Sequence, residues 1–223
     1  MSIVHHLDDA TLMGLAAGTL TPALAVVAAS HVTWCPQCRQ GLAAAEAVGG
    51  ALLAGLAPVP IEREPPALPV AEPEWARPQP AEATSSAGSP GAVSSSELPP
   101  PLARLVGGSL DAIRWRPLAI GIWHHRITLD GKDSGELRLI KVSRGYGLPA
   151  HGHTGAELTL VLRGAYDDVL GHFGPGDVAD LDAEIEHQPV TSIGAACISV
   201  AASDAPMRFN GWIARAMQAV LRI

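Results

Sequence analysis

Two groups of histidines, each with cysteine or glutamate nearby, have the residue types and spacing that suit metal binding. The first lies in the stretch HVTWCPQC, where His31 stands four residues before Cys35 and Cys38 completes a C-x-x-C pair. If a helix continues through His31, the histidine and the first cysteine share one face. Structural zinc sites use four nitrogen or sulfur ligands, so a fourth must come from elsewhere. His6 is the predicted fourth ligand, with its neighbour His5 as the alternative.

Other interpretations of the C-x-x-C pair are a cytosolic redox pair and two incidental core thiols. No βαβ pattern of the thioredoxin kind surrounds Cys35 and Cys38. The segment predicts short helices rich in Ala and Gly, which bury little apolar area, and so small a unit often depends on a metal for stability. Zinc is therefore the favoured prediction for this group.

The second group lies in GYGLPAHGHTGAELTLVLRG, residues 145–164. His151 and His153 are two residues apart, so on a strand they point to the same side, and Glu157 opens the next strand-like run. His187 follows eleven residues after Gly176. Three imidazoles and one carboxylate suit zinc, manganese, nickel or iron, and the ligand set alone does not choose among them.

A proline-rich stretch divides the chain into two parts. Residues 58–101 hold 12 of the 19 prolines, and such a segment sustains neither helix nor sheet. Structureless loops beyond about 15 residues are uncommon inside one compact domain. The sequence therefore predicts two domains, residues 1–57 and 102–223, joined by a linker over 58–101.

The first part reads as helices. Asp8 or Asp9 is the predicted cap of a helix through TLMGLAAGTL, with Gly18 near its end. Pro22 suits the first position of a second helix, and a third is predicted from Cys35-Pro36 to about residue 56.

The second part changes to short strand-like runs separated by glycine-containing turns. These runs are ELRLIKV (136–142), ELTLVLRG (157–164), ACISVAA (196–202) and a segment near Trp123; a final helix is predicted in GWIARAMQAVL. Many short strands at such spacing indicate a sandwich or small barrel. The predicted fold class is multidomain α + β, with a small zinc-stapled helical domain followed by a β-barrel.

Charge and composition limit the partners. The formal net charge of −7 argues against binding to nucleic acid, which needs a basic surface. The start lacks the pattern of a signal peptide, and the apolar run over 43–57 is shorter than the roughly 20 residues that cross a bilayer. A cytoplasmic protein without a membrane partner or a disulfide scaffold is expected. The acidic residues between 167 and 186 are expected to form a solvated rim.

Both groups of residues carry a family resemblance. An early histidine followed by H-x-x-x-C-x-x-C is similar to the zinc-binding anti-sigma domain, which grips an extracytoplasmic-function sigma factor. Residues 145–164 fit G-x5-H-x-H-x3-E-x6-G, the first cupin motif. The second cupin motif is looser: Gly176-Asp177 and His187 are present, but the positions usually held by proline, glycine and asparagine carry other residues: Asp182, Glu184 and Thr191.

In this order the two domains resemble the ChrR-type anti-sigma factors. The resemblance implies a helical zinc site and a cupin site for zinc or another divalent metal, with the ligands His6, His31, Cys35 and Cys38 in the first and His151, His153, Glu157 and His187 in the second. It also implies a cytoplasmic protein that holds one sigma factor through the helical domain and releases it when the cupin responds to singlet oxygen or an organic hydroperoxide. The family usually has a further helix that embraces the sigma factor, and here the linker around Trp75 stands in its place.

Two alternatives compete with that interpretation. Cupins with three histidines and a glutamate include dioxygenases, isomerases and decarboxylases, although only Tyr146, Arg163 and Tyr166 offer further acid, base or substrate contacts here. A metal buffer without a protein partner is the other alternative. The family often carries a C-x-C pair at Cys197, but its second position is Ser199 in this chain, so a buried single thiol is predicted. An anti-sigma factor without enzymatic activity is the favoured prediction.

Overall fold

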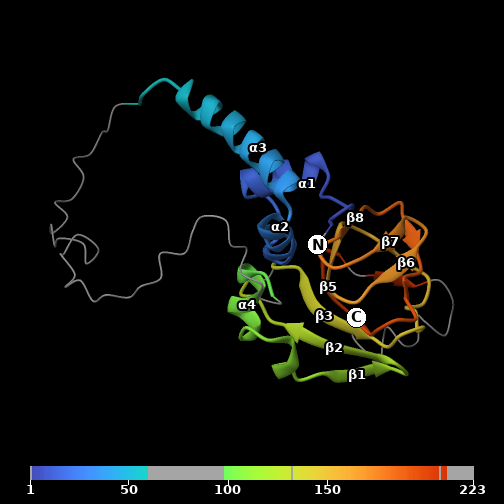
Figure 1. Ribbon diagram of the computed structural model, residues 1–223. Coiled ribbons are helices and arrows are strands. Elements are labelled where there is room, and N and C mark those ends of the chain that lie inside the picture. Colours follow the sequence, from blue (N-terminus) through green and yellow to red (C-terminus); the bar gives the residue numbers. More distant parts are fainter. Residues whose placement is uncertain (1, 60–97, 132, 206, 210–223) are drawn as a thin grey trace, which may run out of the picture.

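Helices form the first part of the chain, as predicted. The computed structural model describes residues 2–59, 98–131, 133–205 and 207–209 (Figure 1). The first three helices are α1 (Asp9–Ala17), α2 (Pro22–Trp34) and α3 (Pro36–Ala54). Figure 1 shows α3 projecting away from the strands, with α1 and α2 beside its first turns.

The helix boundaries follow local chemistry. Asp8 caps α1, because its Oδ1 accepts a hydrogen bond from the backbone N–H of Thr11 at 2.6 Å. Gly18 ends α1 in the left-handed conformation, with φ 67°. Pro22 begins α2, and Cys35 separates α2 from α3 while its Sγ accepts from the N–H of Cys38. The predicted starts are confirmed, and α3 ends two residues earlier than predicted.

The second part consists of strands in three sheets. A six-stranded antiparallel sheet has the order β1-β2-β3-β11-β5-β8, and two three-stranded sheets have the orders β10-β6-β7 and β12-β4-β9. The predicted helical unit followed by a cupin-type β domain is confirmed, but the pairings among the described residues do not close into one barrel. The strands are β1 (Arg116–Ala119), β2 (Ile122–Ile127), β3 (Glu136–Val142), β4 (His151–His153), β5 (Glu157–Arg163), β6 (Tyr166–Asp168), β7 (Gly171–Phe173), β8 (Val178–Leu181), β9 (Glu186–His187), β10 (Val190–Thr191), β11 (Cys197–Ser203) and β12 (Met207–Phe209).

The segment between the two parts includes one short helix. Helix α4 (Pro100–Val106) begins inside the range predicted as linker and is followed by a 3-10 turn, η2 (Leu110–Ala112). Leu98 and Leu102 are buried, so the end of the predicted linker packs against the body of the protein. The linker around Trp75 and the predicted helix in residues 211–221 lie outside the described residues.

One apolar core runs through the helical and the β parts. Helix α2 packs on β5 and β11 as well as on α4. Its Leu24 and Val27 belong to the same buried cluster as Leu160 of β5 and Val200 of β11. Full burial of one such side chain stabilises the fold by about 1.5–3 kcal/mol. The helical unit is therefore docked on the β domain through its second helix.

Among the described residues, no one helix has both the length and the apolar character needed to cross a bilayer. Helices α1 and α2 pass the test of length and apolar character only as a pair, and the chain bends by 111° between them.

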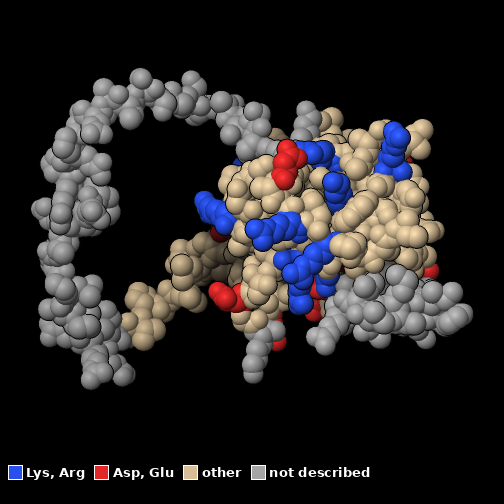
Figure 2. Space-filling model, turned by 90° about the horizontal axis from the view of Figure 1, so that it is seen from below, with Lys and Arg blue, Asp and Glu red and all other residues tan. Residues whose placement is uncertain are grey.

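The net negative charge is distributed unevenly. Strands β1 to β3 carry Arg116, Arg126 and Lys141, and Arg114 lies just before them. Figure 2 shows Lys and Arg side chains gathered on the face seen from below, the side on which Figure 1 places β1 and β2. The acidic total of the chain thus coexists with one basic face of the β domain.

Candidate metal centres

The helical cluster brings together the four residues predicted as zinc ligands. His6 precedes α1, His31 lies in the last turn of α2, and Cys35 and Cys38 begin α3. The Nδ1 atom of His6 lies 3.2 Å from Cys35 Sγ and 3.7 Å from Cys38 Sγ, and His31 Nε2 lies 3.2 Å from Cys38 Sγ. Tetrahedral zinc with bonds of about 2.0–2.3 Å needs nitrogen and sulfur ligands about 3.5 Å apart. The four side chains fit a zinc ion.

His5, the alternative fourth ligand, is turned away from this cluster. Its ring stacks on Phe173 with the centroids 3.9 Å apart, and its Nε2 lies 3.0 Å from the backbone oxygen of His172. The structure therefore brings His6, and not His5, to the two thiols.

Burial shifts the pKa values of His31 and Cys38 in the helical cluster. Burial lowers the pKa of His31 to about 4, so its imidazole is neutral at neutral pH. Burial raises the pKa of the Cys38 thiol to about 11. A metal ion that binds a thiolate at this place would release a proton and would offset the cost of burying the charge.

His31 also connects the helical cluster to the β domain. Its Nδ1 lies 2.9 Å from the backbone oxygen of Gly176. A carbonyl only accepts, so Nδ1 carries the hydrogen and the Nε2 lone pair points at Cys38. The carbonyl of Gly176 thereby fixes the tautomer that a metal requires, which is the usual role of the outer partners of a ligating histidine.

Two aspartates of the β domain hold the segment that carries His6. Asp177 Oδ1 accepts hydrogen bonds from the N–H groups of Val4 and His5 at 2.7 and 2.9 Å, and its Oδ2 accepts from Gly174 N at 2.8 Å. Asp180 Oδ2 accepts from the N–H of Asp8 at 3.0 Å. We call Gly176, Asp177 and Asp180 the N-terminal clamp.

The clamp corrects the prediction of a solvated acidic rim. Asp177 is only 3% exposed, and the side chain of Asp168, also assigned to that rim, is fully buried. The sequence marked Asp177 only as part of a turn in the second cupin motif. The contacts of the two aspartates were not predicted, because their partners lie far away in the chain: the backbone N–H groups of Val4 and His5, and the ring of His187.

The cupin cluster is built from three strands. His151 and His153 come from β4, Glu157 begins β5, and His187 ends β9, where it pairs directly with His151. All four are buried, and the ligand atom that each offers lies within 4.8 Å of the others. His187 Nε2 lies 3.1 Å from His151 Nε2 and 3.3 Å from His153 Nε2.

The hydrogen bonds of the Nδ1 atoms show that His151 and His187 turn the lone pairs of their Nε2 atoms toward each other. Nδ1 of His151 lies 2.8 Å from the oxygen of Pro149, and Nδ1 of His187 lies 3.2 Å from Asp168 Oδ2. Both partners only accept, so both Nδ1 atoms carry hydrogen and the two Nε2 lone pairs face each other without a donor between them. Converging lone pairs are favourable only around a cation, so the donor set fits a divalent metal.

Glu157 supplies the carboxylate of this site. Burial raises its pKa to about 7, although Thr159 Oγ1 donates a hydrogen bond to Oε1 at 3.1 Å. Burial also lowers the pKa of His151 and of His153 to about 4, so both imidazoles are neutral and able to bind a metal. A divalent cation would keep the buried carboxylate ionised.

The backbone conformation explains why glycine stands at the two ends of the cupin motif. Gly145 and Gly164 adopt positive φ angles of 72° and 74°. A Cβ at Gly164 would also collide with the backbone of Ala196 and Cys197. The motif therefore fixes the turns before and after the ligand strands, as well as the ligands themselves.

The fold and the two clusters define a class of protein in which a helical unit with a four-ligand Cys/His cluster is docked on a cupin-type β domain. A family model described as "ChrR Cupin-like domain" matches residues 105–205. The anti-sigma-E factor ChrR of Cereibacter sphaeroides is 39% identical over 223 residues, which is 100% of each chain. A crystal structure of Rhodobacter sphaeroides SigE in complex with the anti-sigma ChrR matches with a TM-score of 0.74 and 37% identity, covering 91% of this chain and 100% of that one. The chain belongs to the ChrR family of anti-sigma factors, which confirms the resemblance seen in its sequence.

Replacing Cys35 and Cys38 by serine is expected to remove one zinc ion per chain, because neutral hydroxyls are far weaker zinc ligands than thiolates. Metal content measured on purified full-length protein tests this. Cys197→Ser is the matched control, since this buried thiol lies in neither cluster. Unchanged zinc in the double variant would contradict the assignment of the thiols.

Asp177→Asn is expected to speed zinc transfer from the helical cluster to a chelator by about 10-fold or more, because Asp177 holds the backbone of the segment that carries His6. The amide cannot accept from Val4, His5 and Gly174 together, so the segment carrying His6 loosens. Stopped-flow transfer to a colorimetric chelator measures the rate. Asp182→Asn, an exposed neighbour, is the control, and equal rates in the two variants would show that the clamp does not support the metal.

Proposed function

We propose that this chain is an anti-sigma factor that holds one extracytoplasmic-function sigma factor in an inactive 1:1 complex and releases it under oxidative stress. Zinc in the helical cluster and zinc or another divalent metal in the cupin cluster belong to this proposal, as does a cytoplasmic location. Support comes from the family relation over the full chain and from the matching ChrR chain, which was solved bound to SigE.

The observation in this molecule that favours a protein partner is an apolar surface on the distal half of α3. Val48, Leu52, Leu53 and Leu56 are between 52% and 71% exposed. Val48 and Leu52 are four residues apart and so lie on one face of α3, and Leu56 follows just after the helix ends at Ala54; we call these residues the stripe. Neighbouring exposed apolar side chains of this kind are typical of a surface that another protein covers. Figure 1 shows this part of α3 standing free of the β domain.

The metal cluster at the base of α3 would fix the direction of this surface. When bound, zinc supplies a four-coordinate crosslink between the segment before α1, the end of α2 and the start of α3. Besides this crosslink, the buried side chains of these helices include Leu12 in α1, which belongs to the apolar core, and Ala45 in α3. The side chains of the cluster therefore hold the helices that present the partner surface.

A physical route connects the cupin cluster with the helical one. Glu157 begins β5, and Val161 of the same strand exchanges backbone hydrogen bonds with the clamp: Gly176 N donates to Val161 O at 2.9 Å, and Val161 N donates to Asp177 O at 3.0 Å. The clamp in turn contacts His31 and the segment around His6. A shift of β5 would thus reach the zinc ligands through the clamp.

We infer that oxidant acts on the cupin part and that displacement along this route loosens the helical unit from the sigma factor. A cupin enzyme, the main alternative, has less support, because the relative that matches over the whole chain is an anti-sigma factor.

Leu52→Glu is expected to weaken sigma-factor binding by about 30-fold or more, because a charge would be buried in an apolar contact. The exposed position of Leu52 implies that stability of the free chain stays unchanged. Co-purification from the native cytoplasm followed by mass spectrometry identifies the sigma factor, and titration with that factor gives the affinity. Ala47→Glu, on the opposite side of α3, is the matched control. Capture of the sigma factor by the Leu52 variant at full affinity would contradict the assignment of the stripe.

His151→Ala combined with Glu157→Ala is expected to abolish the response to oxidant while inhibition of the sigma factor persists. The change removes two of the four ligands in the cupin cluster and leaves the helical cluster intact. A sigma-dependent reporter, measured with and without singlet oxygen, tests both halves of this statement. His125→Ala serves as control, because this histidine belongs to neither cluster and its Nδ1 lies 3.2 Å from the backbone oxygen of Arg114. Normal induction in the double variant would exclude the cupin route.

A further inference from the structure

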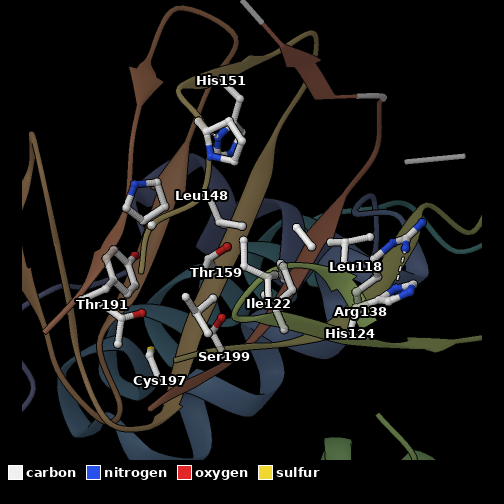
Figure 3. Close-up of a pocket in the computed structure, with 18 of the residues that line it drawn as sticks. Leu118, Ile122, His124, Arg138, Leu148, His151, Thr159, Thr191, Cys197 and Ser199 are labelled. Atoms are coloured by element: carbon white, nitrogen blue, oxygen red, sulfur yellow. Dashed lines mark hydrogen bonds between the residues drawn. The ribbon is translucent and has the colours of Figure 1, made fainter. Parts of the chain in front are cut away.

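A cavity of about 580 Å³ lies beside the cupin cluster, inside the β domain (Figure 3). His151, Glu157 and His187 form one part of its wall. Figure 3 shows the side chains of Leu148 and Ile122 beyond the histidines, and much of the remaining wall is also aliphatic. The cavity is therefore a largely apolar space that begins at the cupin cluster.

One border of this cavity leaves aliphatic side chains in contact with water. Ile120, in the turn between β1 and β2, is 85% exposed, and Pro149, just before β4, is also exposed. Leu118 and Leu148 are only partly buried. All four residues line the cavity, and we call them the rim. Exposed apolar side chains that gather in one place are typical of a surface that another segment or molecule covers.

The register of β12 brings the chain to this rim. Strand β12 pairs with β4 in antiparallel order, and its last residue, Phe209, lies opposite His151. Phe209 is also the last described residue of the chain. Because the pairing is antiparallel, the direction of β12 beyond Phe209 leads along the segment before β4, toward Pro149. The chain therefore leaves the described part of the β domain beside the cavity.

The sequence that follows, NGWIARAMQAVLRI, has the pattern of an amphipathic helix. At helical spacing three polar residues share one face: Arg215, Gln218 and Arg222. Three apolar residues share the opposite face: Ile213, Met217 and Val220. A free helix of this length is marginal in water, so its stability depends on a surface that covers the apolar face.

The segment is also long enough to cover the cavity. The helix predicted over residues 211–221 would be about 16 Å long at 1.5 Å per residue. The part of the wall that runs from Gly147 to His151 covers at most about 13 Å, even if it is fully extended. A helix that starts near His151 could therefore reach from the cupin cluster to the far end of this wall.

We propose that residues 210–223 dock on the rim as a helix, with the face of Ile213, Met217 and Val220 against the rim and the polar face toward solvent. A second copy of the chain or a lipid surface could also receive an amphipathic helix. The exit of the chain beside the cavity favours its own rim, because docking there needs no second molecule. The inference concerns the β domain and does not rest on the proposed function.

Amide hydrogen exchange, measured by mass spectrometry on the full-length protein, tests the docking. The amides of residues 215–221 are expected to exchange at least about tenfold more slowly in the unmodified protein than in Met217→Glu, because a charge on the apolar face removes the contact with the rim. Methionine and glutamate have similar helix propensities, so the substitution changes the contact rather than the helix itself. Gln218→Glu adds the same charge to the polar face and is the matched control, in which the slow exchange is expected to persist.

A substitution on the rim tests the location. Ile120→Glu is expected to speed exchange in residues 215–221 as much as Met217→Glu does, and the exposed position of Ile120 implies that the β domain stays folded. Ile193→Glu is the matched control, because Ile193 is 86% exposed and does not line the cavity. Fast exchange in the unmodified protein, or slow exchange that survives Ile120→Glu, would overturn the proposal. So would slow exchange that is lost on dilution, which indicates a second copy, or that arises only with anionic lipid vesicles.

Discussion

The imidazole of His31 is the contact on which both parts of the molecule depend. One ring nitrogen faces Cys38 in the helical cluster, and the other donates to the carbonyl of Gly176 in the β domain. An imidazole can serve both partners only as the neutral tautomer with hydrogen on Nδ1, and burial favours the neutral form. The docking of the helices on the β domain and the geometry of the helical cluster therefore depend on the same tautomer of His31.

The cupin cluster follows the same rule with different partners. The carbonyl of Pro149 and the carboxylate of Asp168 take the Nδ1 hydrogens of His151 and His187. In both clusters a group outside the ligand set decides which nitrogen is free. Gly176 and Asp168 are distant in the chain from the histidines that they contact, whereas Pro149 lies two residues before His151. The sequence motifs identify the candidate ligands, whereas the fold brings Gly176 and Asp168 to the ring nitrogens that face away from the clusters.

The difference between local ligand motifs and distant partners explains which features could be predicted from the sequence. Ligands that lie close together in the chain have a spacing that a helix or a strand converts into a shared direction, so His31 with Cys35 and His151 with His153 could be recognised. Helix ends could be predicted because Asp8, Pro22 and Gly18 act locally.

What could not be predicted depends on long-range packing. The cupin motif identifies Asp177 as part of a turn, but not as the residue that holds the segment around His5. The docking of α2 on β5 and β11 has no sequence pattern of its own in an alanine-rich helix.

The placement of the partner surface constrains how a signal could act. The exposed stripe lies on the distal half of α3, which Figure 1 shows pointing away from the strands, while the clamp holds the opposite end of the helical unit. A change in the β domain therefore has no direct access to the stripe. It reaches the helices through the clamp and through α2, where His31 and the shared core meet. Because α3 begins at the two thiols, a small rotation of the cluster at its base moves the distal end of this 19-residue helix by a larger distance. The helical cluster thus lies where a local change in geometry has its greatest effect on the surface that the partner would cover.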